Sequence, residues 1–245
     1  MKTIKSFSLI AFVALFISSC ISFNGMQGNG NVVRENRNIQ EEFDAISIST
    51  GISARLITGE ASEVIVESDE NLQEMIITEV EDGVLKVYSK GNIWGSSTRK
   101  VYIKMPRVES ISSQSGSNVK SEYPISASDL MLSSSSGSRI DVELNAKFID
   151  ADVSSGSSII LKGSADQIKA DVSSGSSFNG RALTTEEAEL DVSSGASIRV
   201  DVSKFLKASA SSGGSIRYTG SPDQYLAFNF VGRPSNIYSF FIYLP

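Results

Sequence analysis

Serine and lysine come closest, among the residue types of this chain, to a catalytic arrangement. The spacing Ser-x-x-Lys, in which a lysine amine activates a serine hydroxyl, occurs at Ser97/Lys100 and at Ser117/Lys120. The chain holds 46 serines in 245 residues, so chance alone provides about two such pairs. Histidine is absent, which excludes a Ser-His-Asp triad, a His-ligated zinc and an imidazole base. We therefore expect no enzyme and no catalytic residues.

Three aspartates recur at intervals near 20 residues, at Asp152, Asp171 and Asp191. Stacked carboxylates offer the oxygen ligands that Ca²⁺ prefers, so these three are the candidate calcium ligands. The alternative is a solvated outer face whose charges lie beside Lys147 and Lys169. The calcium-binding nonapeptide Gly-Gly-x-Gly-x-Asp is absent, and the 28 acids are too scattered to single out a pair for glycoside hydrolysis. We favour the solvated face, with no metal and no cofactor.

Cys20 is the single cysteine, which excludes an internal disulfide and a cysteine-rich metal site. It follows two lysines and an apolar run over residues 7–17 that is too short to span a bilayer. The sequence Ile17-Ser18-Ser19-Cys20 resembles a bacterial lipobox, whose cysteine is acylated and becomes the new N-terminus. We predict a signal peptide over residues 1–19 and lipidation of Cys20. The alternative is an ordinary secretory signal.

The residues after Cys20 bear on location. Residues 20–38 are predicted to be a flexible tether, and their first part, to Asn31, contains no acid. Ile21, rather than an aspartate, follows the cysteine, so an inner-membrane retention signal is absent. We expect a cell-envelope protein, with the periplasmic face of the outer membrane slightly preferred over surface exposure. Removing residues 1–19 takes two lysines from the net charge of −6 and leaves −8, which argues against nucleic acid as a partner.

Trp94 is the sole tryptophan and lies in a predicted loop, Gly91-Asn92-Ile93-Trp94-Gly95. An exposed indole beside small polar residues is a candidate platform for stacking a sugar. The alternative is that it packs over the end of the fold.

The middle of the chain repeats. Aligning it on Ser-Gly pairs gives a glycine every 18 to 21 residues, and three copies share the pentapeptide Asp-Val-Ser-Ser-Gly. A period near 20 residues with one motif per copy is typical of a solenoid. The predicted corner glycines are Gly116, Gly137, Gly156, Gly175, Gly195 and Gly213.

Apolar and polar residues alternate on both sides of each glycine. Positions seven, five and three before the last four glycines are apolar, and positions three and five after the glycines from Gly137 on mostly are; Phe178 with Gly180 is the exception. This alternation predicts two strands per copy that meet at a Ser-Ser-Gly corner and stack on the next copy as parallel sheets. Glycine supplies the corner geometry. The predicted serine column at the corners is Ser115, Ser136, Ser155, Ser174, Ser194 and Ser212.

Residues 39–110 also read as strands, over residues 43–48, 64–67, 84–88 and 101–105, with a short helical turn at 71–74. Two interpretations remain open. These strands continue the solenoid with longer loops, or they cap its N-terminal end, since an uncapped end is an adhesive edge.

Several motifs in this order resemble the bacterial head GIN domain family. They are the segments 43–48 and 51–56, then Asn71-Leu72 with 78–85, then 101–106 leading into the Ser-Gly repeats at 111–220. The resemblance implies an all-β, right-handed parallel β-helix-like solenoid with coils of about 20 residues over 39–220, and many lipid-anchored or secreted members. It brings no catalytic residues. The apolar tail at 221–245 departs from the family pattern and is either a cap, a further strand or a frame error in the gene.

The expected function is that of a lipid-anchored, non-catalytic cell-envelope solenoid with an adhesin-like binding role. One alternative is a periplasmic polysaccharide-binding or polysaccharide-processing protein, and another is a structural envelope component. The expected partners are the membrane, through the lipid anchor, and a glycan or an envelope protein.

Overall fold

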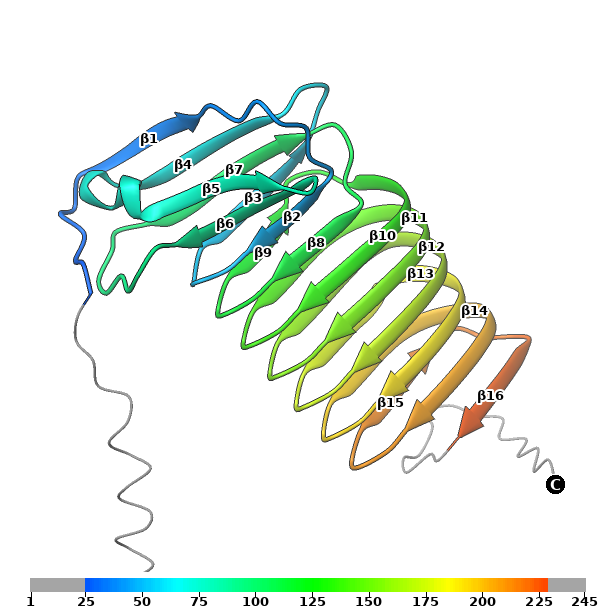
Figure 1. The fold of residues 1–245 in the computed structure, drawn as a ribbon. Helices are drawn as coiled ribbons and strands as arrows, with labels where there is room; N and C mark the ends of the chain where they lie inside the picture. Colours follow the sequence, from blue (N-terminus) through cyan, green and yellow to red (C-terminus); the bar gives the residue numbers. More distant parts are fainter. Residues whose placement is uncertain (1–24, 229–245) are drawn as a thin grey trace, which may run out of the picture.

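The computed structural model describes residues 25–228. The signal peptide, Cys20 and residues 229–245 of the tail therefore lie outside the described residues. Within them the chain forms one stack of β coils, each with two walls that meet at a tight corner (Figure 1). No helix among residues 25–228 is long and apolar enough to cross a membrane.

The Ser-Gly repeats build the regular part of this stack. Every neighbouring pair of strands in it is parallel, and equivalent positions such as Ile140 and Ile159 pair directly, so a coil takes about 19 residues. The predicted parallel β-solenoid is confirmed. Its strands are β8 (Ser110–Ser113), β9 (Asn118–Ser121), β10 (Ile125–Ser134), β11 (Arg139–Val153), β12 (Ser158–Val172), β13 (Ser177–Val192), β14 (Ser197–Ala210), β15 (Ser215–Thr219) and β16 (Gln224–Phe228).

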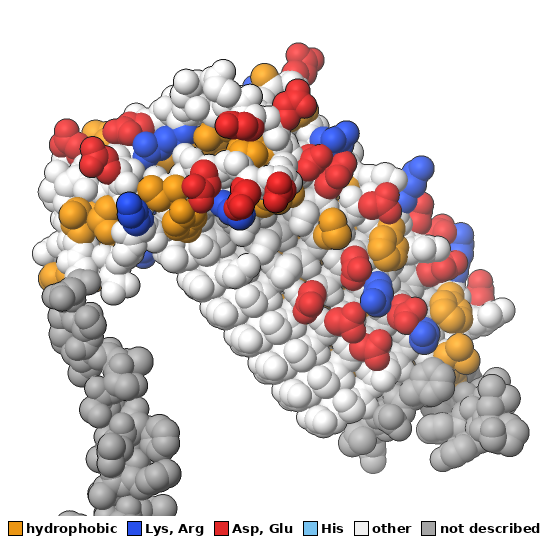
Figure 2. Space-filling model, in the orientation of Figure 1, with side chains coloured by type: hydrophobic (Ala, Val, Ile, Leu, Met, Phe, Trp, Pro, Cys, Tyr) orange, Lys and Arg blue, Asp and Glu red, His pale blue; other side chains and the backbone are white. Residues whose placement is uncertain are grey.

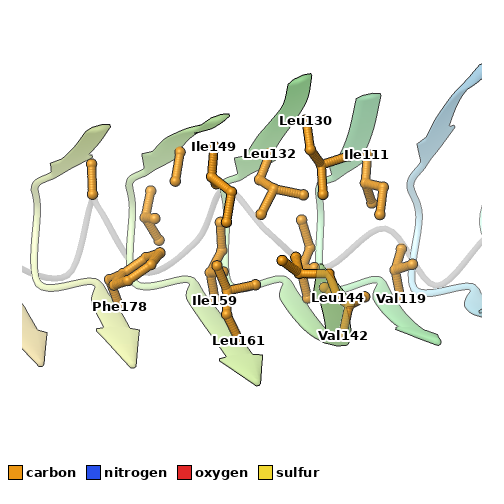
Figure 3. Close-up of a cluster of buried hydrophobic side chains, with 14 of the residues drawn as sticks. Ile111, Val119, Leu130, Leu132, Val142, Leu144, Ile149, Ile159, Leu161 and Phe178 are labelled. Carbon is orange, nitrogen blue, oxygen red and sulfur yellow. The ribbon is translucent and has the colours of Figure 1, made fainter. Parts of the chain in front are cut away.

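The predicted inward columns are buried between the two walls (Figure 3). Phe178 replaces a smaller residue in its column, and Gly180 leaves the room for it, since a Cβ there would lie 3.1 Å from the phenyl ring. The columns include Ile149, Ala151 and Val153 before one corner, Ile168, Ala170 and Val172 before the next, and Ile140, Ile159 and Ile198 after the corners.

The corners have the geometry that the glycines predict. In each, a serine and the following glycine both have positive φ, as in Ser155 (56°) and Gly156 (70°). A Cβ at Gly156 would meet no atom within 4 Å, so backbone conformation rather than lack of space selects glycine. From Gly116 to Gly195, each corner glycine N–H donates to the corner serine carbonyl of the next coil; for Gly137 to Ser155 the distance is 3.0 Å.

The N-terminal region adds two more coils to the same stack. Strands β2 (Ala45–Ile48) and β3 (Ser53–Thr58) form one coil, with its corner at Thr50 and Gly51. Strands β6 (Val84–Ser89) and β7 (Arg99–Met105) form the other. The β2–β3 coil lies between the β6–β7 coil and the β8–β9 coil, so the stacking order differs from the chain order.

Antiparallel strands then close this end. β5 (Ile76–Glu81) pairs with β6, β4 (Glu63–Asp69) pairs with β7, and β1 (Val32–Arg37) pairs with β4. The short 3₁₀ helix η1 (Glu70–Met75) joins β4 to β5 and covers the predicted turn at 71–74. Residues 39–110 thus do both things the sequence left open, since they extend the solenoid and cap it.

The structure bears on two predictions about the segments before and after the solenoid. The flexible tether was predicted over residues 20–38, but β1 lies inside it, and Met26 already forms a bridge to Ile93. The prediction is wrong for residues 25–38 because the open edge of β4 offers backbone partners that a polar sequence can use. At the other end, β16 continues one wall by pairing with β14, so this part of the predicted tail is a further strand.

Candidate interaction surface

The corners of the repeats form a continuous, hydroxyl-rich surface, here called the corner face. It consists of the residues two and one before each corner glycine and the residue two after it. In the middle coils every one of these residues is serine and none is charged. Figure 2 shows this face as a ribbed, uncharged surface, with the acids and lysines gathered on the adjoining wall and bend. Its members from the three central coils are Ser154, Ser155, Ser158, Ser173, Ser174, Ser177, Ser193, Ser194 and Ser197.

A second serine column, directly after the corner glycines, is buried and was missed by the sequence analysis. Each of its hydroxyls donates to a backbone carbonyl of the neighbouring coil, at 2.5 to 2.8 Å. These hydrogen bonds tie coil to coil beneath the corner face and make it rigid. Strict period-two alternation could have found the column, because it places this residue inward. Its members are Ser117, Ser138, Ser157 and Ser176.

Neither Ser-x-x-Lys pair is assembled. The buried hydroxyl of Ser117 donates to the carbonyl of Ile48 at 2.7 Å, whereas Lys120 is exposed. The amine of Lys100 lies 3.7 Å from the carboxylate of Glu67 instead. No lysine base therefore faces either serine hydroxyl in these contacts.

The three aspartates do stack in register, Asp152 beside Asp171 beside Asp191. Partial burial raises the pKa of Asp171, and the negative charges of its two neighbours add to this, while Lys169 at 3.6 Å acts in the opposite direction. They line a shallow hollow of about 150 Å³. Among residues 25–228, no three acid, cysteine or histidine side chains are grouped so that they could hold a metal ion. The geometry gives the calcium alternative no support.

Trp94 packs over the end of the fold and is also exposed, so it has features of both alternatives, end packing and a sugar-stacking platform. Its indole N–H donates to the carbonyl of Gly25 at 2.8 Å, and a Cβ on Gly25 would lie 2.7 Å from the indole ring. The ring therefore packs on the N-terminal segment at the end of the stack. It is nevertheless 53% exposed, next to Met26, which is 45% exposed.

Asp69, which the sequence analysis did not single out, holds this end together. Its buried carboxylate accepts hydrogen bonds from the backbone N–H of Gly30 (2.7 Å) and of Ser97 (2.8 Å), joining the N-terminal segment to the Trp94 loop. Burial acts to raise the pKa of Asp69, but these backbone hydrogen bonds outweigh it and hold the pKa below its ordinary value. Gly28 permits the contact, since a Cβ there would lie 2.6 Å from the carboxyl carbon.

A larger open hollow, of about 610 Å³, lies where β1 ends beside the start of β4. Arg37, Glu63 and Lys104 supply its charges, and no aromatic side chain lines it. A polysaccharide-processing site needs a groove with several acids and aromatic rings. Neither of the two hollows described here has that lining.

The fold is a β-solenoid of parallel strands whose corners carry serine hydroxyls. The candidate catalytic residues considered above are not brought together in it. The chain belongs to the head GIN domain family, described as a putative auto-transporter adhesin, which matches residues 42–222. No curated protein matches the chain.

Solved structures share the fold. A putative adhesin from Bacteroides fragilis superposes with a TM-score of 0.79 at 17% identity, covering 83% of this chain and 95% of that one. A putative adhesin from Parabacteroides merdae gives a TM-score of 0.67 at 18% identity, covering 83% and 95%. A putative lipid binding protein from Parabacteroides distasonis gives 0.62 at 18% identity, covering 84% and 96%. At these identities the likeness shows the fold alone.

Proposed function

We propose that this protein is a lipid-anchored, non-catalytic component of the cell envelope that binds other surfaces through its corner face. The observation that carries the proposal is the corner face itself. In the central coils it repeats the same three serines, of which the one directly before the glycine is exposed and the other two are half-buried, on a backbone held by the buried serine column. A rigid array of hydroxyl groups loses little conformational freedom on binding and matches a partner that also repeats, such as a glycan.

Adhesion fits the molecule better than polysaccharide processing does. Neither hollow has an aromatic lining: the smaller is lined by the stacked aspartates among valines and serines, and the larger has Arg37, Glu63 and Lys104 as its charged residues. The family and two of the similar structures are described as adhesins. A purely structural role in the envelope is the second candidate, favoured by β15 and β16, each of which pairs with β14 alone among the strands of residues 25–228.

The anchor follows from Cys20, and the periplasmic face of the outer membrane is the preferred location. The first experiment is protease shaving of intact cells, with Cys20→Ala as the control for anchoring. Digestion from outside, together with release of the variant from membranes, supports a surface adhesin. Protection until the outer membrane is opened supports the periplasmic location and limits the partners to envelope components. Retention of Cys20→Ala in membranes overturns the lipid anchor.

A second experiment tests the corner face directly. Purified protein is incubated with cell-envelope polysaccharide, and the variant Ser155→Glu/Ser174→Glu is compared with Lys162→Glu, which changes the charge away from the corners. We expect the corner variant alone to lose binding. Equal binding by both variants would move the interaction to another surface, and concentration-dependent sedimentation without glycan binding would favour the structural role.

A further inference from the structure

The spacer between Cys20 and the folded domain is much shorter than the sequence suggests. A tether over residues 20–38 would reach about 65 Å at full extension. However, residues 25–31 are held on the domain. The carbonyl of Gly25 accepts the indole N–H of Trp94, and Met26 bridges to Ile93. Further along, Gly30 is bonded to Asp69.

This attachment limits how far the domain can stand from the membrane. From Cys20 to Gly25 the chain spans at most about 17 Å. The polar headgroup layer of a bilayer is itself about 5–7 Å thick. Trp94 contacts Gly25 directly, so a lipidated Cys20 keeps Trp94 close to the bilayer surface whichever way the solenoid leans.

The side chains around that point suit a lipid surface. Trp94 and Met26 are both exposed and are joined by a hydrogen bond from the Trp94 N–H to the Met26 carbonyl, at 3.2 Å. Because the indole N–H already donates to Gly25, the exposed part of the ring is apolar. Within residues 25–228, the other exposed large hydrophobic residues are on separate elements: Val32 on β1, Tyr123 between β9 and β10, Met131 on β10 and Leu226 on β16.

The charges near Trp94 also bear on contact with a lipid surface. The segments 25–31 and 90–100 contain Lys90, Arg99 and Lys100 and no acid, in a chain that is acidic overall, although Lys100 is paired with Glu67 at 3.7 Å. Asp69 beneath them is buried, and beside them lies the exposed acid Glu70, whose carboxylate accepts a hydrogen bond from the amide of Asn31 at 2.9 Å. Basic residues favour contact with anionic lipids, and tryptophan concentrates at membrane interfaces.

We propose that Trp94 and Met26 form a membrane-contacting face that lies in the lipid headgroup layer and orients the solenoid on the membrane. This proposal rests on the proposed lipid anchor at Cys20. Trp94 lies in the corner loop of the outermost coil, two coils before the first Ser-Gly corner. The contact therefore places the start of the corner face nearest the membrane and directs the remaining coils away from it.

Trp94 is the only tryptophan, so its fluorescence tests the proposal without labelling. Acylated mature protein is reconstituted in vesicles of phosphatidylethanolamine and phosphatidylglycerol, with or without lipids brominated near the headgroup. We expect a blue shift of emission, quenching by the brominated lipids and reduced quenching by iodide, all relative to Cys20→Ser protein in buffer. The matched control, Trp94→Phe/Tyr123→Trp, moves the reporter to an exposed loop and should show none of these changes.

The outcomes separate the two proposals. If the protein co-sediments with vesicles but the Trp94 emission stays as in solution and is still quenched by iodide, the membrane-contacting face is overturned and the anchor stands. If the mature protein carries no acyl chain and does not co-sediment with vesicles, the lipid anchor is overturned. Blue-shifted emission caused by soluble envelope oligosaccharide in the absence of vesicles makes Trp94 a sugar platform and also overturns the membrane-contacting face.

Discussion

The Ser-Gly repeats and the N-terminal region share one core and one sheet, but they are specified differently. In the repeats, coils stack in the order in which the chain makes them, and the strand pairing beside the corners recurs from coil to coil, with register shifts away from the corners between β12 and β13 and between β13 and β14. In the N-terminal region the β2–β3 coil is inserted between two coils that are made later. Identical neighbours can specify a stack by local pattern alone, whereas an inserted coil needs contacts that occur once.

The cap at this end has polar contacts of its own that also occur only once. Gln73 in η1 is buried and donates to the carbonyl of Val33, while Arg37 donates to the side-chain and backbone oxygens of Gln73. Asp69 joins the two segments beside Trp94. The regular coils thus rely on repeated apolar columns and serine hydrogen bonds, and the cap relies on a few buried polar groups.

The largest expected effect is the loss of a core column in the repeats. Val172→Asp places an unpaired carboxylate at a position that is 2% exposed, which should cost several kcal/mol. Because coils contact only their neighbours, this change should divide the stack, and thermal unfolding should show two transitions. Asp171→Val changes the adjacent outward position and is the control. A single unchanged transition for Val172→Asp would show that the inward column is misassigned.

The next effect distinguishes two kinds of glycine. Gly163→Ala should be the more destabilising, since its Cβ would lie 1.9 Å from the carbonyl oxygen of Leu144, a backbone atom. Gly156→Ala meets open space, so only its positive φ opposes it, at about 1–2 kcal/mol. Urea unfolding of both variants measures the difference. Equal losses would mean that the coils separate easily enough to admit a methyl group.

Acid should loosen the packing of the N-terminal cap around Asp69, whereas the Ser-Gly repeats should stay folded in the same pH range. The folded-state pKa of Asp69 is lowered, so its contribution is fully present above the ordinary carboxyl value of about 4 and is lost as pH falls through the lower folded value. We expect Trp94 emission of the unanchored protein to shift to the red in that range. Asp69→Asn should show the shifted emission already at pH 7.

Amide hydrogen exchange supplies the control for this prediction. Exchange in residues 26–37 should increase in Asp69→Asn, with the repeats unchanged. A loss of protection across both regions at once would make the cap and the repeats a single cooperative unit.

The smallest expected effect is at Asp171, where ionisation of the carboxyl lowers stability instead of raising it. The folded-state pKa of Asp171 is raised, so its ionisation disfavours folding as pH rises from the ordinary carboxyl value through the raised one. Asp171→Asn should therefore raise the melting temperature slightly at pH 7 and leave it unchanged in acid. Calcium titrated into the wild type serves as a further check. A calcium-dependent rise in melting temperature that Asp171→Asn abolishes would reinstate the aspartate column as a metal site.

The repeats could be predicted from the sequence almost residue by residue. The inward columns, the corner glycines and the serine column at the corners follow from a period of two within a period near 20, because each coil meets a copy of itself. Local chemistry is then enough to define both the fold and the corner face. The buried serines after the glycines belong to the same pattern and could have been predicted from it.

The N-terminal end was decided by tertiary structure. Ser49-Thr50-Gly51 has the same local pattern as the Ser-Ser-Gly corners, but no local signal shows that the β2–β3 coil stacks between the β6–β7 coil and the β8–β9 coil. Residues 25–31 read as a polar spacer, yet they are ordered by Asp69 and Trp94 from distant parts of the chain. Such contacts join residues some 40 to 70 positions apart, and their stability depends on burial that no local pattern encodes.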